Sequence, residues 1–528
     1  MIRFDQLKIK YKKSQALSTI RRHIGKKLRI DVEDIHHIEI LRQSIDARRN
    51  DIYFVYSVAF CCRNEKQILK KYPLLIKKMV KTEYKYPQMG NCTLPSRPVI
   101  IGAGPAGLFC ALWLAEKGYA PIVYERGSSM SERVKDVDLF LKQRVLNEES
   151  NIQFGEGGAG TFSDGKLTAR TKDERANKVL RTFIKYGAEP SIAYEAHPHI
   201  GTDVLRKVIV QMRKAIIDLG GDIHFHAKLD SIYVEDHAVK SIFINGKQQT
   251  CAVLVLALGN SARETFKMLQ KKGVCMESKP FAVGLRIEHP QIDINKALYH
   301  DAFLHPHLEA ASYRLTHKAE QRGVYTFCMC PGGEVVAATS KKQHLVVNGM
   351  SYHARDKENA NSAILVQVNH HDYGNGVFDG MQFQEDLEKA MFVLGGSNYT
   401  APVQLVKDFL DNVESMKAAS VAPSYALGVK YVNLRKALPE SIGDYLEQGL
   451  RAFAKMNAAF KNEEAVLTGI ETRSSSPIRL LREDNMESHS VQRVFPIGEG
   501  SGYAGGIISS ALDGIRCAEN IMKIYKNK

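Results

Sequence analysis

One segment near residue 100, RPVIIGAGPAGLFCALWLAEKGYAPIVYERG, constrains the fold more than any other part of this sequence. An apolar strand, Val99–Ile101, runs into a GxGxxG pattern made by Gly102, Gly104 and Gly107, and an apolar helix and a second strand follow. In such a β-α-β unit, Gly102 makes the tight turn, Gly104 lets a pyrophosphate approach the backbone, and Gly107 lets helix and strand pack closely. The segment therefore predicts a dinucleotide site in a Rossmann-like domain.

Two neighbours of the glycine turn belong to the same predicted site. Pro105 and Ala106 begin the helix, whose free N–H groups and positive dipole end attract phosphates. Glu125 ends the second strand, 23 residues after Gly102, where a carboxylate would accept the ribose hydroxyls of the adenosine half.

Two later segments repeat the pattern of a strand that ends in small residues. CAVLVLALG is an apolar strand that ends at Ala257 and Gly259. Near the end of the chain, FPIGEGSGYAGGIISSALDGIRCAENI gives a strand, then Gly498, Glu499 and more glycines, then an amphipathic helix. A long helix (202–219) and a β-meander (223–244) precede the first of these strands.

These three pieces together resemble the FAD-binding domain of the glutathione-reductase-like flavoprotein superfamily. The resemblance implies FAD as cofactor, with Glu499 on the ribitol hydroxyls, although the common form of the motif has Asp there. It also implies roles for residues outside the glycine turn. Gly505, Gly506 and Ile507 would face the flavin ring. Arg126 and Arg133 would bind the phosphates, and the Leu229 backbone would contact adenine. A solvated helix face is the alternative for Arg133.

Four longer motifs narrow the resemblance. They are FGEGGAGTFSDGKLTAR (154–170), FCMCPGGEVVAATS (327–340), ETRSSSP (471–477) and GEGSGYAGGI (498–507). They resemble bacterial FAD-dependent dehydrogenases, also described as NAD(FAD)-utilising, that carry an N-terminal accessory domain. The resemblance implies a fold and a cofactor, and it implies no substrate.

The glycine-rich loop 155–165 is the first place where we expect chemistry. Its backbone around Gly158, Ala159 and Gly160 can press against the flavin ring, and Lys166 is our candidate for a cation that stabilises the reduced flavin. A surface lysine after a turn is the alternative. No second GxGxxG strand motif and no CxxxxC follow, so NAD(P)H would have to dock transiently; otherwise the substrate itself donates the hydride.

Other candidates lie further along the chain. In GLRIEHP, Arg286 is a candidate catalytic residue beside Glu288 and His289, and alternating charges on a half-exposed strand are the alternative. Cys328 and Cys330 could place a thiol near the flavin, but buried strand thiols are the more frequent explanation. The turn Ser474–Ser476 could bind an anionic group of the substrate or cofactor, and a capped loop is the alternative. The histidine pairs show no known ligand spacing, so we expect no metal.

Charge and strand periodicity divide the chain. Residues 1–97 hold 22 Lys and Arg against 9 Asp and Glu, and the other 431 residues hold 51 against 49. We expect a basic, ferredoxin-like α+β domain at 1–94, a Rossmann-like FAD-binding domain at 95–280 and 466–528, and a mixed α+β substrate or cap domain at 281–465. The basic domain could hold RNA, dock an acidic partner or cover the flavin domain.

The resulting expectation is an FAD-dependent oxidoreductase that passes hydride between an unknown small molecule and flavin N5. The alternatives are an RNA-directed flavoprotein and a flavin-binding protein without catalysis. We expect a cytoplasmic protein, because no signal peptide pattern and no apolar run of about 18 residues is present. The oligomeric state stays open.

Overall fold

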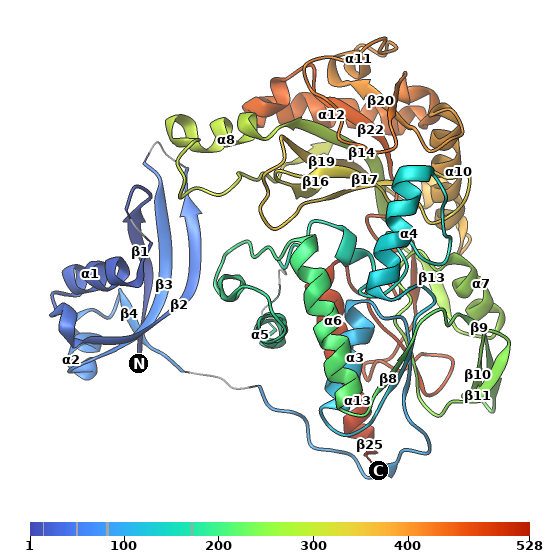
Figure 1. Cartoon of the computed structure of the whole chain (residues 1–528), viewed down its shortest axis with the longest axis horizontal. Coiled ribbons are helices and arrows are strands. Elements are labelled where there is room, and N and C mark those ends of the chain that lie inside the picture. The colour runs from blue at the N-terminus through green and yellow to red at the C-terminus, as the bar shows by residue number, and fades with distance from the viewer. Residues whose placement is uncertain (14, 49–50, 81–83, 169–170, 172, 528) are drawn as a thin grey trace.

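The computed structural model describes residues 1–13, 15–48, 51–80, 84–168, 171 and 173–527. Ala169 and Arg170, the end of one motif noted above, lie outside the described residues. Figure 1 shows a small N-terminal module at the left, a lower lobe built on a parallel sheet and an upper lobe built on a larger sheet. No helix among the described residues is long and apolar enough to cross a membrane.

The lower lobe is built on a five-stranded sheet in the order β24-β12-β6-β7-β8, in which every neighbouring pair is parallel. Its strands are β6 (Val99–Ile101), β7 (Ile122–Tyr124), β8 (Asp222–His224), β12 (Leu254–Leu256) and β24 (Val494–Pro496). The strands most central in this sheet are buried on both faces, as a parallel sheet requires. The predicted Rossmann-like fold is confirmed.

Layers on each face explain this burial. Ile100 and Val255 face an apolar core with four helices: α3 (Pro105–Ala115), α5 (Arg175–Lys185), α6 (Thr202–Asp218) and α13 (Ile507–Ile524). Alternate residues such as Ile101 and Leu254 face a second core, beneath an antiparallel sheet and one helix. These elements are β9 (Leu229–Glu235), β10 (Ala238–Ile244), β11 (Lys247–Thr250) and α7 (Arg263–Lys271).

The upper lobe is a seven-stranded mixed sheet in the order β15-β16-β19-β14-β22-β20-β21. The strands are β14 (Phe281–Pro290), β15 (Thr316–Ala319), β16 (Arg322–Cys330), β19 (Asn359–Val368), β20 (Ala401–Leu405), β21 (Val429–Tyr431) and β22 (Val466–Glu471). Its helices are α8 (Gln291–Tyr299), α9 (His370–Tyr373), α10 (Asp379–Leu394), α11 (Val406–Leu410) and α12 (Glu440–Met456). A hairpin of β17 (Glu334–Ala337) and β18 (Val347–Met350) forms a separate two-stranded sheet.

Strand β14 corrects one expectation. Arg286, Glu288 and His289 were considered as alternating charges on a half-exposed strand, and all three are fully buried. The reason is that β14 lies in the centre of the sheet, between β19 and β22, and is covered on both faces.

The N-terminal module has the order β1-α1-β2-β3-α2-β4 and the sheet order β2-β3-β1-β4, which is the ferredoxin-like topology expected. Its elements are β1 (Ile2–Lys10), α1 (Leu17–Leu28), β2 (Ile35–Asp46), β3 (Tyr53–Cys62), α2 (Glu65–Lys71) and β4 (Ile76–Lys78). Phe54 and Tyr56 are buried in its core, whereas Tyr53 of the same strand is half-buried.

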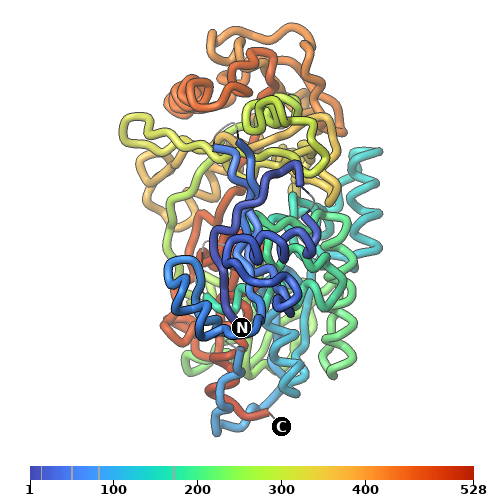
Figure 2. The backbone as a smooth tube through the Cα atoms, turned by 90° about the vertical axis from the view of Figure 1, so that its left-hand side faces the viewer, coloured from blue at the N-terminus to red at the C-terminus, as the bar shows by residue number. Residues whose placement is uncertain are grey.

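The module docks on the rest of the chain. Figure 2 shows it in blue, lying in front of the two lobes in that view. The edge strand β2 exchanges backbone hydrogen bonds with a loop of the lower lobe: Gln43 N–H donates to Tyr194 O at 2.6 Å, and Ala196 N–H donates to Gln43 O at 2.8 Å. Ala47 and Ile52, at the tip of the β2-β3 hairpin, share a buried apolar cluster with Met329 of the upper lobe.

Short pairings complete the chain. The linker strand β5 (Cys92–Thr93) pairs with β25 (Tyr525–Lys526) at the C-terminus, and β13 (Met276–Ser278) pairs with β23 (Ile478–Leu480) between the lobes. The boundaries proposed at residues 94, 280 and 465 stay predictions.

Candidate functional site

An open pocket lies where the parallel strands end and the upper lobe begins. Carboxyl ends of parallel strands are the usual ligand site of open α/β sheets. The structure brings most of the sequence-predicted cofactor residues together here. They are Gly102, Gly104, Pro105, Ala106, Glu125, Arg126, Gly158, Ala159, Gly160, Leu229, Ala257, Gly259, Gly498, Glu499, Gly505, Gly506 and Ile507. Their contacts with a cofactor stay predictions.

Glu125 organises the glycine turn at one end of the pocket. Its carboxylate accepts hydrogen bonds from the backbone N–H groups of Ala103 at 2.8 Å, Gly127 at 2.9 Å and Gly155 at 3.0 Å. These donors come from three separate loops, so one buried carboxylate fixes the positions of all three.

Arg126 lines the pocket near the same end. Its guanidinium lies 2.6 Å from both Glu149 and Glu264 and 4.1 Å from the centre of the Phe154 ring. Its Nη1 atom is buried and has no hydrogen-bond partner within the chain. A buried donor without a partner is costly, which fits a ligand acceptor at this position.

Arg133 on α4 (Met130–Gln143) corrects the expected phosphate clamp, and it also corrects the solvated alternative. Its side chain is fully buried, and its guanidinium donates to the carbonyl oxygens of Asn151, Ile152, Glu156 and Gly158 at 2.6–2.9 Å. The guanidinium group therefore stabilises the glycine-rich loop and is not available to a phosphate. Burial lowers the pKa of Arg133 to about 9.

Gly107 also has a packing role. A Cβ atom at this position would lie 1.9 Å from Gly102 O, so only glycine lets α3 pack against the turn. The residue itself lies behind the pocket wall.

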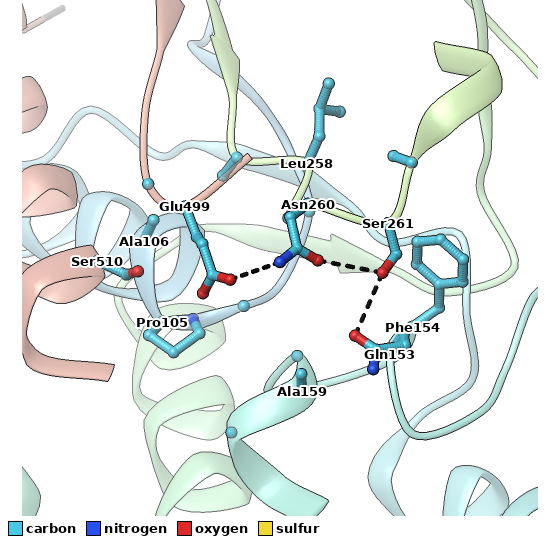
Figure 3. Close-up of a pocket in the computed structure, with 18 of the residues that line it drawn as sticks. Pro105, Ala106, Gln153, Phe154, Ala159, Leu258, Asn260, Ser261, Glu499 and Ser510 are labelled. Atoms are coloured by element: carbon cyan, nitrogen blue, oxygen red, sulfur yellow. Dashed lines mark hydrogen bonds between the residues drawn. The ribbon is translucent and has the colours of Figure 1, made fainter. Parts of the chain in front are cut away.

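Glu499 anchors a polar chain across the middle of the pocket, shown in Figure 3. Asn260 Nδ2 donates to Glu499 at 2.6 Å, and the Ser261 hydroxyl lies within hydrogen-bond distance of the side-chain oxygens of Asn260, at 3.2 Å, and Gln153, at 3.3 Å. Burial raises the pKa of Glu499 from 4.5 to about 7. Sequence reasoning missed Asn260, Ser261 and Gln153; the first two follow the small-residue end of β12, which was the available signal.

The far end of the pocket is formed by the upper lobe. Cys328, Asn348, Glu471, Arg473 and Ser474 line it. Arg473 pairs with the buried Glu388 at 2.9 Å and donates to Ser340 at 2.6 Å. The ETRSSSP turn thus places Arg473 and Ser474 on the pocket.

Lys166 and Arg286, the two candidate catalytic residues, are not among the residues that line the pocket, and their catalytic roles stay predictions. Lys166 Nζ is buried 3.1 Å from Asp164. Burial opposes its charge, but Asp164 raises the pKa of Lys166, so the ammonium group stays charged. Arg286 pairs with Glu471 at 2.5 Å and donates to Asn361 at 2.7 Å.

The neighbouring Glu288 and His289 do not join this group. Glu288 accepts hydrogen bonds from Ser424 on one side of the sheet. His289 lies on the other side, against Tyr313 and Phe460, and burial lowers its pKa to about 3. Among the described residues, no cluster of three or more His, Cys, Asp or Glu side chains could hold a metal ion.

The glycines of the pocket test whether a dinucleotide fits. A Cβ atom on Gly505 or Gly506 would meet no protein atom within 4 Å, and one on Gly104 would meet only Gly158 Cα at 3.9 Å. The space beside these residues is therefore left free for something other than protein. Two helix N-termini, those of α3 and α13, open onto it. The donor set and the free space fit FAD.

This fold and site define an FAD-dependent flavoprotein with an oxidoreductase-type fold. Residues 280–474 match the model of a family described as "FAD-dependent protein, C-terminal domain-like", and residues 1–61 match a domain of unknown function. The chain belongs to the same family as a Clostridium beijerinckii protein described as uncharacterized, with 48% identity over 514 residues and 96% of each chain covered. FAD is the cofactor of this protein.

Solved structures with a similar fold share little sequence. Glycine oxidase from Bacillus cereus is 11% identical, with a TM-score of 0.36 over 81% of this chain and 97% of that one. The flavin-dependent brominase Bmp2 is 11% identical, with a TM-score of 0.36 over 80% and 77%. These scores are too low to bear on the chemistry of this chain.

Proposed function

We propose that this protein is an FAD-dependent dehydrogenase or reductase that transfers a hydride between a small molecule and its flavin. The observation that supports this most is the composition of the pocket's two ends. One end is backbone and glycine at helix N-termini, as a dinucleotide phosphate requires, and the other is a wall of ionisable groups from the upper lobe. FAD, when bound, supplies a two-electron redox centre.

The residues of the upper-lobe wall have distinct tasks in this proposal. Arg473, held by Glu388 and Ser340, presents a fixed positive charge that can orient an anionic substrate. Burial raises the pKa of Glu471, although Arg286 opposes the shift. Because Glu471 lines the pocket and its pKa is raised, it is a candidate to exchange a proton with substrate.

Lys166 acts through its charge in this proposal. Its pKa is raised, so it does not release a proton readily near neutral pH. It is also not among the residues that line the pocket. We assign it a positioning and electrostatic role that favours negative charge on the reduced cofactor.

The electron donor is tested by mixing the flavin-loaded protein anaerobically with NADH and, separately, with NADPH. Rapid bleaching of the flavin absorption by one of them means a reductase on which NAD(P)H docks transiently. Bleaching by neither, together with bleaching by a hydroxy acid or amino acid donor, means a dehydrogenase reduced by its own substrate. A flavin that dithionite reduces and that no donor of these classes reduces would contradict the proposal.

The RNA-directed alternative has no support in the comparisons. It rested on the charge of residues 1–97, and the aromatic residues Phe54 and Tyr56 that could have stacked on bases are buried in the module's core.

A further inference from the structure

Strand β16 carries a strained bulge at the pocket wall. Its pairing with β19 shifts by one residue between Phe327 and Cys330, so one residue is extra. Cys328 sits in this bulge with φ of +44°, a left-handed conformation that costs a residue with a Cβ atom on the order of 1 kcal/mol. The bulge turns Cys328 to the pocket, which it lines.

The same bulge keeps a second thiol beside the first. Cys330 Sγ is buried and donates to Cys328 O at 3.2 Å. Met329, between the two, is buried in the apolar cluster that the tip of the N-terminal module covers. The packing of Met329 in this cluster thus fixes the backbone of the three residues, and the two thiols lie near one another.

Two cations flank this pair. Arg286 Nη2 donates to Cys328 O at 2.7 Å and lies 3.3 Å from Cys330 Sγ. Interaction with the Cys330 thiol, and then the charges of Lys166 and Arg286, lower the pKa of Cys328, while burial and, more weakly, Asp164 oppose them. Burial raises the pKa of Cys330. Cys328 is therefore the more acidic of the two thiols.

A second pair of neighbouring thiols in this chain shows what is particular to the first. Cys110 on α3 and Cys517 on α13 interact inside the apolar core of the lower lobe, and burial raises the pKa of Cys517. Proximity is common to both pairs. A strained backbone and a place on the pocket wall distinguish Cys328 and Cys330.

We propose that Cys328 and Cys330 form a redox-active pair that exchanges two electrons with the flavin, an inference that rests on the function proposed above. On oxidation, the two thiols lose two protons and two electrons, and a bond forms between their sulfur atoms. The two electrons and one proton pass to oxidised FAD in the pocket, and the other proton leaves. The reverse step, in which reduced FAD is the reductant, restores the two thiols.

Electron counting on the flavin-loaded chain tests the pair without knowledge of the substrate. Anaerobic titration with dithionite should consume about four electrons per chain in the oxidised wild type and about two in Cys328→Ser or Cys330→Ser. Cys275→Ser, which removes an exposed cysteine, is the matched control and should keep the wild-type value. Uptake of about two electrons by the wild type would overturn the proposal.

Peptide mapping of the wild type gives a second readout that needs no variant to fold. Alkylation before and after reduction should show the peptide with Cys328 and Cys330 as an internal disulfide in oxidised protein and as two alkylated thiols in reduced protein. Two alkylated thiols in both states would overturn the pair and leave the FAD-dependent function standing. A chain that binds no flavin would overturn both.

Discussion

Gly104 is the residue on which the position of the cofactor depends most directly. Its backbone is extended, with φ of −77° and ψ of −177°, so any residue can adopt this conformation. A side chain there would fill pocket space and not protein, because the nearest atom to a Cβ is 3.9 Å away. The fold should therefore tolerate a side chain that the cofactor does not.

Gly104→Val should give folded protein that has lost most of its flavin. We expect the ratio of flavin to protein absorption to fall at least about 10-fold, while the circular dichroism spectrum matches that of wild-type apoprotein. Gly107→Val is the contrasting variant, because its Cβ would clash with Gly102 O and should destabilise the fold itself. A Gly104→Val protein that is still fully yellow would contradict this position of the site.

Glu499 gives the pocket a pH dependence. Because burial raises its pKa from 4.5 to about 7, the folded chain binds more protons than the unfolded chain between these values. The stability contributed by this residue therefore falls as pH rises from about 4.5 to about 7. Glu499→Gln removes the titration and should keep a polar partner for Asn260.

The prediction concerns the melting temperature of apoprotein. The melting-temperature difference between Glu499→Gln and wild type should be about 3 °C more positive at pH 8 than at pH 5. The exposed Glu463→Gln should show the same difference from wild type at both values. Equal effects of Glu499→Gln at the two pH values would refute the shift.

At the residue scale, the sequence predicts what is encoded locally. The glycine turn and Glu125 lie within one β-α-β unit, so spacing alone placed them at the pocket. Glu499 contacts Asn260, and through it Ser261 and Gln153, only in the tertiary structure. No spacing in the sequence predicts this contact. The predicted role of Arg133 is wrong for the same reason. The carbonyl groups that accept its hydrogen bonds lie in a loop that only the tertiary structure brings to it.

Arg133 joins helix α4 to the loop that follows it through several buried hydrogen bonds. Arg133→Met would leave several buried carbonyl oxygens without donors, and we expect a loss of about 3 kcal/mol or more in the free energy of unfolding. Urea denaturation measures this, and flavin retention should fall too, because Gly158 of the same loop lines the pocket. Lys135→Met, on the exposed side of α4, is the control and should change stability by less than about 0.5 kcal/mol. A stable Arg133→Met protein would contradict the role.

The elements differ in how far the sequence reveals them. The ferredoxin-like order and the β-α-β unit follow from local periodicity, and both are present. The order of the seven-stranded sheet does not follow, because β14 pairs with β22 across most of the upper lobe's sequence. Charges on β14 suggested exposure, but Glu471 neutralises Arg286 inside the sheet.

At the scale of the whole molecule, the N-terminal module supports the pocket from behind. Ile52 is 1% exposed and belongs to the cluster that holds Met329, between the two cysteines. Ile52→Asp should loosen this contact, and amide hydrogen exchange in residues 325–331 should speed up by at least about 10-fold. Leu17→Asp, at a site 51% exposed on the module, is the control. Unchanged exchange in the Ile52 variant would show that the module does not brace the bulge.

The central claim is that one pocket between the two lobes holds a whole FAD molecule. The most direct measurement is fluorescence titration of the flavin-free protein with FAD and, separately, with FMN. We predict saturation at about one FAD per chain and at least about 100-fold weaker binding of FMN, because Glu125, Arg126 and the α3 N-terminus then have no adenosine or second phosphate to bind. Equal affinity for the two flavins, or no saturable binding of FAD, would contradict the account.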